Sequence, residues 1–245
     1  MKQNYSKNIA IIIPMANEAL TFEIFTSRLI KVLDLIVNVT VYIVLDKASK
    51  DRTLELFKIL VSTDLRFKVV FSPENRNVVD AYIRGYKEAY IRGHDWVIEM
   101  DAGLSHEPES LPVFFSLLDK EYDCVYGSRF VEGGRMMSCS LKRKLLSKYG
   151  TRISNLLLGT NYSDMTSGFQ GFQRGVVEKL LKFELKSEAH FYQTELKYLL
   201  REYKYIETPI IYSSPSPNVS FKSISNSIQV LFYYFTKRIV DKIKK

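Results

Sequence analysis

Short β-branched runs alternate with longer amphipathic stretches through the first two-thirds of this 245-residue chain. The short runs are apolar enough to be buried strands, and they lie at Ile9–Ile13, Val39–Leu45, Phe67–Phe71, Trp96–Met100 and Cys124–Tyr126. The stretches between them show helical periodicity, at about Glu18–Leu35, Asp51–Val61, Val78–Arg92 and Pro108–Leu118. This order predicts an α/β fold with a mainly parallel central sheet and helices on both of its faces.

After residue 134 the pattern changes, and the expected elements are two helices, a strand and a loop. They lie in this order at Leu141–Leu158, Ser187–Tyr203, Tyr205–Tyr212 and Ser213–Asn218. The loop is predicted from Pro215 and Pro217, which cannot continue a helix or a central strand.

The last segment, residues 221–245, predicts a helix with a broad aliphatic and aromatic face and a basic end. Such a helix can lie in the headgroup plane of a membrane, or it can pack on the domain or in a dimer interface. No 18 apolar residues run uninterrupted, so a membrane-spanning helix is not expected. We therefore expect a domain over residues 1–220, a membrane-interfacial helix over 221–245, and a cytoplasmic location at the membrane face.

The charge balance favours an anionic partner. Lysine and arginine outnumber aspartate and glutamate 35 to 27, which gives a net charge of +8. Nucleic acid, a phosphorylated small molecule and an acidic membrane surface all fit this surplus. Nucleic acid is not expected, because no nucleic-acid-binding motif occurs. The two cysteines, Cys124 and Cys139, are too few for a disulfide framework or a cysteine-rich zinc site.

Acidic residues follow two of the predicted strands, where open α/β sheets bind their ligands. Asp101 follows Trp96–Met100, and period-two alternation directs Glu99 to the same side. An aspartate there can hold a divalent cation that bridges it to a diphosphate, or it can belong to a turn or helix cap. Asp46, after Val39–Leu45, can bond a nucleoside or cap the next helix.

Six motifs occur in order along residues 8–222. They are Pro14-Met-Ala-Asn17-Glu18, Asp46-Lys-Ala-Ser-Lys-Asp51-Arg-Thr53, Asn75 followed by Ala81-x-x-x-Gly85-x-x-x-Ala89, Met100-Asp101-Ala102-Gly-Leu-Ser-His106-Glu-Pro, Gly127-Ser-Arg129-Phe-Val-Glu-Gly-Gly134 and Asp164-Met-Thr-Ser-Gly-Phe169. With these motifs the chain resembles family 2 glycosyltransferases of the GT-A fold, and most closely the dolichyl/polyprenyl-phosphate mannosyltransferase group.

The resemblance implies an inverting transfer of a hexose from GDP-mannose or a UDP-sugar, with Mg or Mn, to polyprenyl phosphate. A glycan or lipid-linked sugar hydroxyl, as in cell-surface polysaccharide synthesis, is the alternative acceptor. A non-catalytic nucleotide-sugar-binding protein is a further alternative.

By the same resemblance, Asp101 would hold the metal and the diphosphate, and Arg129 would meet phosphate. Arg143 and Ser147, one helical turn apart, would meet the acceptor phosphate. The other donor-binding residues implied are Pro14, Asn17, Glu18, Asp46, Asn75 and Ala102.

Two positions depart from the family pattern. Lys47 stands where a second aspartate often reads the nucleobase, and Gly103 stands where the metal motif usually has its second aspartate. Glycine has no side chain to ligate a metal, so one carboxylate is lost. We expect Asp101 to retain the metal, with Glu99 or a water replacing the missing group.

The acceptor decides which side chains the chemistry needs. A metal and arginine neutralise the negative charge that develops on the leaving diphosphate. A sugar hydroxyl also needs a carboxylate base, for which Asp164 and Glu195 are the candidates. A lipid phosphate is already an anion and needs cations instead, for which the candidates are Arg129, Lys142, Arg143 and Lys144. This basic cluster favours a phosphate acceptor.

Overall fold

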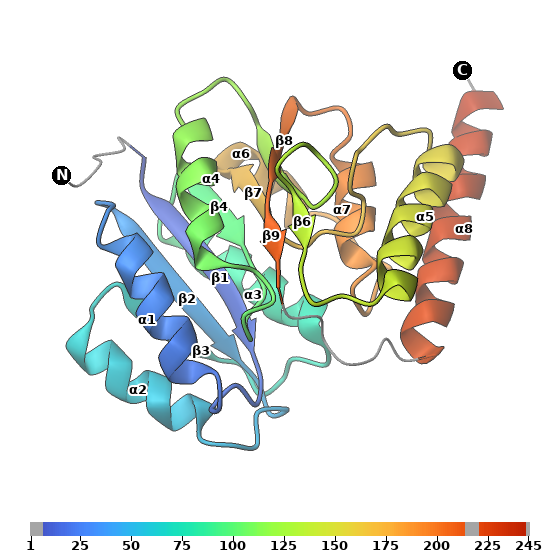
Figure 1. Cartoon of the computed structure of the whole chain (residues 1–245). Coiled ribbons are helices and arrows are strands. Elements are labelled where there is room, and N and C mark those ends of the chain that lie inside the picture. Colours follow the sequence, from blue (N-terminus) through green and yellow to red (C-terminus); the bar gives the residue numbers. More distant parts are fainter. Residues whose placement is uncertain (1–6, 214–220, 244–245) are drawn as a thin grey trace.

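A seven-stranded sheet forms the centre of the computed structural model, which describes residues 7–213 and 221–243. Its strand order is β3-β2-β1-β4-β7-β5-β8 (Figure 1). The strands are β1 (Ile9–Met15), β2 (Val39–Leu45), β3 (Phe67–Phe71), β4 (Trp96–Glu99), β5 (Cys124–Ser128), β7 (Gln170–Gln173) and β8 (Tyr205–Pro209). All of these strands run parallel except β7, which pairs antiparallel with β4 and β5. The predicted mainly parallel sheet is confirmed.

Helices cover both faces of the sheet (Figure 1). They are α1 (Phe22–Leu33), α2 (Thr53–Thr63), α3 (Val78–Ile91), α4 (Leu111–Leu117), α5 (Leu141–Leu158), α6 (Arg174–Leu180), α7 (Tyr192–Leu199) and α8 (Phe221–Ile243). Alternate residues of β1 divide the core in two: Ile11 and Ile13 pack with α1, α2 and α4, whereas Ile12 packs with α3, α6 and α7. This division follows from the period-two alternation of side chains along a strand.

The structure differs from the predicted elements in three places. β6 (Arg135–Met136), β7 and α6 were not predicted at all, although β7 fills the gap between β4 and β5. The expected helix over Ser187–Tyr203 is shorter at both ends, since α7 runs from Tyr192 to Leu199. Before it, the Glu195 carboxylate accepts hydrogen bonds from the backbone N–H groups of Lys186 and Ser187 and holds these residues outside the helix.

The expected strand Tyr205–Tyr212 is also divided in the structure. β8 ends at Pro209, and β9 (Ile211–Tyr212) pairs instead with β6 (Arg135–Met136) in a separate two-stranded sheet. The predicted loop 213–218 lies outside the described residues from position 214 on.

The C-terminal helix α8 packs along α5 (Figure 1). The Arg238 guanidinium donates to the Leu157 carbonyl at 2.8 Å, and Tyr234 Oη donates to Glu195 at 2.7 Å. Within residues 7–213 and 221–243, no helix has the length and apolar character needed to cross a membrane.

Gly85 lets α3 approach the sheet closely, and this contact can be tested. A Cβ at position 85 would overlap Ile12 Cγ2 in the core, whereas a Cβ at Gly150 of α5 would meet no atom within 4 Å. We expect Gly85→Ala to lower the free energy of unfolding by about 1–3 kcal/mol through overpacking. The control Gly150→Ala should raise it by about 0.5–1 kcal/mol, because alanine is the better helix former. Urea denaturation measures both, and equal effects would contradict the close contact.

Candidate active site

Two loops at the carboxyl ends of β1 and β2 are joined by hydrogen bonds. Asn17, at φ 61°, donates from Nδ2 to the Ala48 carbonyl at 3.0 Å and accepts at Oδ1 from Lys50 N at 2.8 Å. Glu18 N donates to Thr53 Oγ1 at 2.8 Å. The predicted donor motifs around residues 14–18 and 46–53 therefore form one surface.

The other predicted donor residues lie at neighbouring strand ends. Pro14 belongs to β1, and Asp46 accepts from Ala48 N at 2.7 Å, directly after β2. Asn75 is buried in the loop between β3 and α3, and its Nδ2 has no hydrogen-bond partner among the described residues. Ala102 follows Asp101 and packs against the core. A buried amide N–H without a hydrogen bond costs folding free energy. An oxygen atom of a bound ligand would therefore be a suitable hydrogen-bond partner for Asn75 Nδ2.

Asp101 lies just beyond β4 with its side chain 31% exposed. Tyr82 of α3 donates to Asp101 Oδ1 at 2.7 Å, and Asp101 N donates to His106 Nδ1 at 2.9 Å. Burial lowers the pKa of His106, so the ring that faces Asp101 is neutral. Asp101 thus presents a carboxylate that no cation of the described chain neutralises.

Glu99 is not free to bind a metal, which corrects the prediction that it replaces the missing carboxylate. It lies on the same side of β4 as Asp101, as predicted, but it is fully buried. Tyr192 Oη donates to it at 2.8 Å, Gln170 Nε2 at 2.6 Å, and Tyr86 Oη also donates. Both oxygens are occupied inside the core.

Arg129 forms a buried ion pair with Asp164. Its Nε donates to Asp164 Oδ2 and its Nη2 to Asp164 Oδ1, both at 2.7 Å, and Nη2 also donates to Thr166 at 2.6 Å. Asp164 is completely buried and Arg129 is 8% exposed. Among the described residues, Nη1 is the guanidinium nitrogen left without a hydrogen bond.

Both carboxylates predicted as bases for a hydroxyl acceptor, Asp164 and Glu195, are buried in this structure and hydrogen-bonded to other groups. Burial alone would raise the pKa of Asp164, but the Arg129 charge lowers it to about 2. Glu195 is likewise fully buried, and its oxygens accept from two backbone amides and from Tyr234. The lowered pKa makes Asp164 a weak base, and its ion pair with Arg129 would have to open before it could accept a proton from a hydroxyl.

Two residues that the sequence analysis did not single out complete this region. Lys197 is fully buried and donates to the backbone carbonyls of Asp164 and Ser167, at 2.6 and 3.2 Å. The Tyr212 ring lies 5.4 Å from the Arg129 guanidinium carbon and 5.7 Å from the His106 ring. No local pattern marks either residue, because their partners lie far away in the chain.

The predicted acceptor residues Arg143 and Ser147 lie on α5, whose first turn is capped by Ser140. Burial raises the pKa of the Tyr212 hydroxyl, while the charges of Arg143 and Arg129 and a hydrogen bond from Arg143 oppose the rise. Tyr212 thus contacts Arg129 through its ring and Arg143 through its hydroxyl. Within the described part of the chain, no hydrogen bond or ion pair joins Ser147 to this group.

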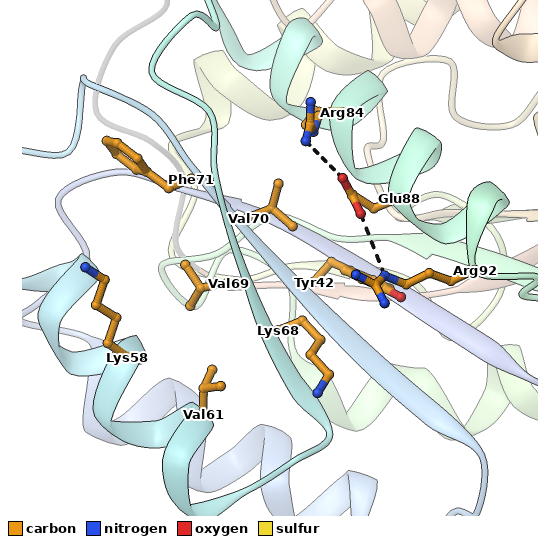
Figure 2. Close-up of a pocket in the computed structure, with 10 residues that line it drawn as sticks. All are labelled: Tyr42, Lys58, Val61, Lys68, Val69, Val70, Phe71, Arg84, Glu88 and Arg92. Carbon is orange, nitrogen blue, oxygen red and sulfur yellow. Dashed lines mark hydrogen bonds and ion pairs between the residues drawn. The ribbon is translucent and has the colours of Figure 1, made fainter.

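A pocket of about 470 Å³ lies elsewhere, beside the edge strand β3 and between α2 and α3. Figure 2 shows Glu88 between Arg84 and Arg92, paired with both. A second pocket, of about 620 Å³, is lined by the start of α3, residues 180–189 and the start of α8. No predicted site residue lines either pocket, so the strand-end surface remains the candidate active site.

The buried Glu99 predicts a measurable pH dependence of stability. Burial raises its pKa from 4.5 to about 8, against the hydrogen bonds from Tyr86, Tyr192 and Gln170. The raised pKa means that Glu99 stabilises the fold fully below its unfolded pKa, and that this contribution is lost as the pH rises toward 8. We expect Glu99→Gln to flatten the fall in unfolding free energy between about pH 5 and pH 8, by up to about 1.4 kcal/mol per pH unit. Identical slopes for parent and variant would contradict it.

Comparison with known proteins identifies the family. The family model described as glycosyl transferase family 2 matches residues 10–181. The polyprenol monophosphomannose synthase of Mycolicibacterium smegmatis is 31% identical over 193 residues, which cover 78% of this chain and 73% of that protein. The undecaprenyl-phosphate mannosyltransferase of Micrococcus luteus is 28% identical over 172 residues, which cover 69% of this chain and 70% of that protein.

A solved structure supports the fold. Glucosyl-3-phosphoglycerate synthase from Mycobacterium tuberculosis, in complex with Mn²⁺, UDP-glucose and phosphoglyceric acid, matches with a TM-score of 0.69 and 17% identity. The match covers 94% of this chain and 80% of that chain. The predicted GT-A fold is confirmed, and the chain belongs to glycosyl transferase family 2.

Proposed function

We propose that this glycosyltransferase moves a hexose, with inversion, from a nucleotide-diphosphate sugar to polyprenyl phosphate at the cytoplasmic face of a membrane. The observation that carries the acceptor class is the burial of Asp164 and Glu195, the two carboxylates predicted as bases for a hydroxyl acceptor. A phosphate acceptor needs no such base. The names of the two relatives, which refer to polyprenol and undecaprenyl phosphate, support the same acceptor.

The donor is proposed to bind across the joined loops at the ends of β1, β2 and β4. Asp46 and the loop of Pro14, Asn17 and Glu18 would hold the nucleoside, and Asn75 would use its unpaired Nδ2. Asp101 and Ala102 would lie at the diphosphate. Lys47, which stands where the family pattern often has an aspartate that reads the nucleobase, is exposed beside Asp46. The transfer assay therefore offers donors with different bases.

A divalent cation, Mg or Mn, is part of this proposal, and the donor set fits it. Asp101 is half-exposed, with one oxygen held by Tyr82, and hard cations take such oxygen ligands. Among the described residues, no three or more histidine, cysteine or acidic side chains are placed to hold a metal together. Mg²⁺ commonly needs only one or two carboxylates besides substrate phosphates. When bound, the cation would neutralise charge on the leaving diphosphate.

The acceptor phosphate is proposed to meet Arg129 through Nη1 and to meet Arg143 and Ser147 on α5. The ion pair with Asp164 holds the Arg129 guanidinium in one orientation, so little side-chain entropy is lost when an anion binds. Tyr212 keeps Arg143 beside it. A phosphate monoester is ionised near neutral pH and attacks without giving up a proton to the enzyme.

Transfer of labelled sugar to polyprenyl phosphate tests the proposal. GDP-mannose and UDP-glucose are offered as donors with Mn²⁺, and Asp101→Asn should abolish the product. Arg143→Ala should lower kcat/KM for the acceptor about tenfold or more, since a charge-assisted hydrogen bond contributes about 1.5–3 kcal/mol. Lys179→Ala, which removes an exposed basic side chain of α6 outside the proposed membrane surface, is the control and should change little. Transfer to a glycan hydroxyl but not to polyprenyl phosphate would contradict the proposal.

The helices α5 and α8 are proposed to rest on the membrane. Exposed apolar side chains cover both, and they are Leu141, Leu145, Leu146, Tyr149, Ile153 and Leu156 on α5 and Phe221, Ile224, Ile228, Phe232, Tyr233, Ile239, Val240 and Ile243 on α8. Exposed basic side chains lie on the same helices, including Lys142, Lys148 and Lys237. The division of the chain into a domain over residues 1–220 and a separate helix over 221–245 stays a prediction. In the structure α8 packs against α5 of that domain.

Cosedimentation with vesicles of anionic phospholipid tests this surface. The double variant Phe221→Ser/Phe232→Ser should lose most of the bound fraction, because two exposed apolar side chains no longer insert. The control Leu65→Ser/Ile91→Ser removes two exposed apolar side chains that lie outside α5 and α8, and it should bind as the parent does. Equal binding by both double variants would contradict a membrane role for α8.

A further inference from the structure

Gly103 leaves a space beside Asp101 that another side chain fills. Gly103 has φ +67° and lies two residues after Asp101. A Cβ built on it would lie 2.9 Å from Glu18 Oε1 and 3.0 Å from Glu18 Oε2. A side chain at position 103 would therefore point into the Glu18 carboxylate. The place where a second carboxylate of this loop would stand is held by Glu18, which comes from the loop after β1.

Hydrogen bonds hold both the backbone and the side chain of Glu18 in this place. Its backbone N donates to Thr53 Oγ1 at 2.8 Å, and the next backbone N, that of Ala19, donates to Asp51 at 2.9 Å. Thr21 Oγ1 donates to Glu18 Oε2 at 2.7 Å. The carboxylate is thus positioned before any ligand arrives, which reduces the entropy lost on binding.

The charge of Glu18 has no cationic partner in residues 7–213 and 221–243. No ion pair involves it, and Oε1 accepts no hydrogen bond there. Burial raises the pKa of Glu18, the bond from Thr21 opposes the rise, and the negative charge of Asp51 adds to it. A half-buried carboxylate that is held in place and lacks a counter-charge is suited to receive a cation.

We propose that Glu18 is the second protein ligand of the divalent cation, with Asp101 as the first. Position 103 cannot supply a carboxylate, and Glu18 takes over that role from a different strand end. This inference rests on the proposed cation-dependent transfer, and it changes the role of Glu18 from nucleoside contact to cation ligand. Two carboxylates together with donor phosphates form an ordinary oxygen ligand set for Mg²⁺ or Mn²⁺.

Mn²⁺ binding, measured by calorimetry on the whole protein with GDP or UDP present, tests this directly. Glu18→Ala should weaken Mn²⁺ binding at least tenfold, and Glu23→Ala, an exposed acidic residue of α1, should not. The double variant Glu18→Ala/Gly103→Asp should recover most of the affinity, because the removed side chain leaves room for an aspartate. Aspartate is one of the few residues tolerated at a positive φ. A thermal melt of each variant checks that it is folded.

The outcomes separate this inference from the proposed function. If Asp101→Asn weakens Mn²⁺ binding and Glu18→Ala does not, the inference is wrong and the proposed function stands. A folded double variant that recovers no affinity would also overturn the inference. A parent protein that binds no Mn²⁺ with either nucleotide would overturn the cation proposal itself, and the transfer assay would then decide the function separately.

Discussion

The buried ion pair between Arg129 and Asp164 is the interaction on which the candidate active site depends. It joins the end of β5 to the loop that leads into β7, and Lys197 fastens the same loop through two backbone carbonyls. Removing one member of such a pair leaves an uncompensated buried charge and costs about 3–5 kcal/mol. The pair also restricts what each side chain can do. It occupies both Asp164 oxygens, and it leaves one guanidinium nitrogen of Arg129 to bind an anion.

The two carboxylates of the Glu99–Asp101 segment show how environment divides similar groups. Tyr82 and Tyr86, one turn apart on α3, donate to Asp101 and Glu99 respectively. Glu99 is sealed in the core, where burial raises its pKa to about 8, whereas Asp101 is 31% exposed at the strand end. The alternation of strand side chains places both on one side of β4. Although they are only two residues apart, Glu99 has a structural role in the core and Asp101 is a candidate metal ligand.

Much of the fold could be predicted, because buried parallel strands are continuous apolar runs that stand out from amphipathic helices. β7 was missed for a physical reason: its sequence, Gln-Gly-Phe-Gln, is half polar. The side-chain amides of both glutamines donate to partners distant in the chain, Gln170 to Glu99 and Gln173 to the Tyr122 carbonyl.

The sequence selects candidate site residues, but it does not show which of them pair with one another. Family-like motifs selected Glu18, Asp101, Arg129 and Asp164, and the structure brings the last two together. The burial of Glu99 and Asp164 and the contact of Glu18 with position 103 depend on packing between distant segments. Local sequence carries no sign of such contacts, so it could not show that Glu99 is occupied in the core or that Asp164 is paired with Arg129.

The central claim is that the acceptor arrives as an anion and that the enzyme supplies no base. The pH dependence of kcat/KM, compared between a polyprenyl phosphate and a polyprenyl phosphonate whose second pKa is higher, tests this claim most directly. The account predicts that the acidic limb of the profile moves to higher pH with the phosphonate, because the limb belongs to the acceptor. A limb that keeps its position with both acceptors would belong to a base on the enzyme and would contradict the account.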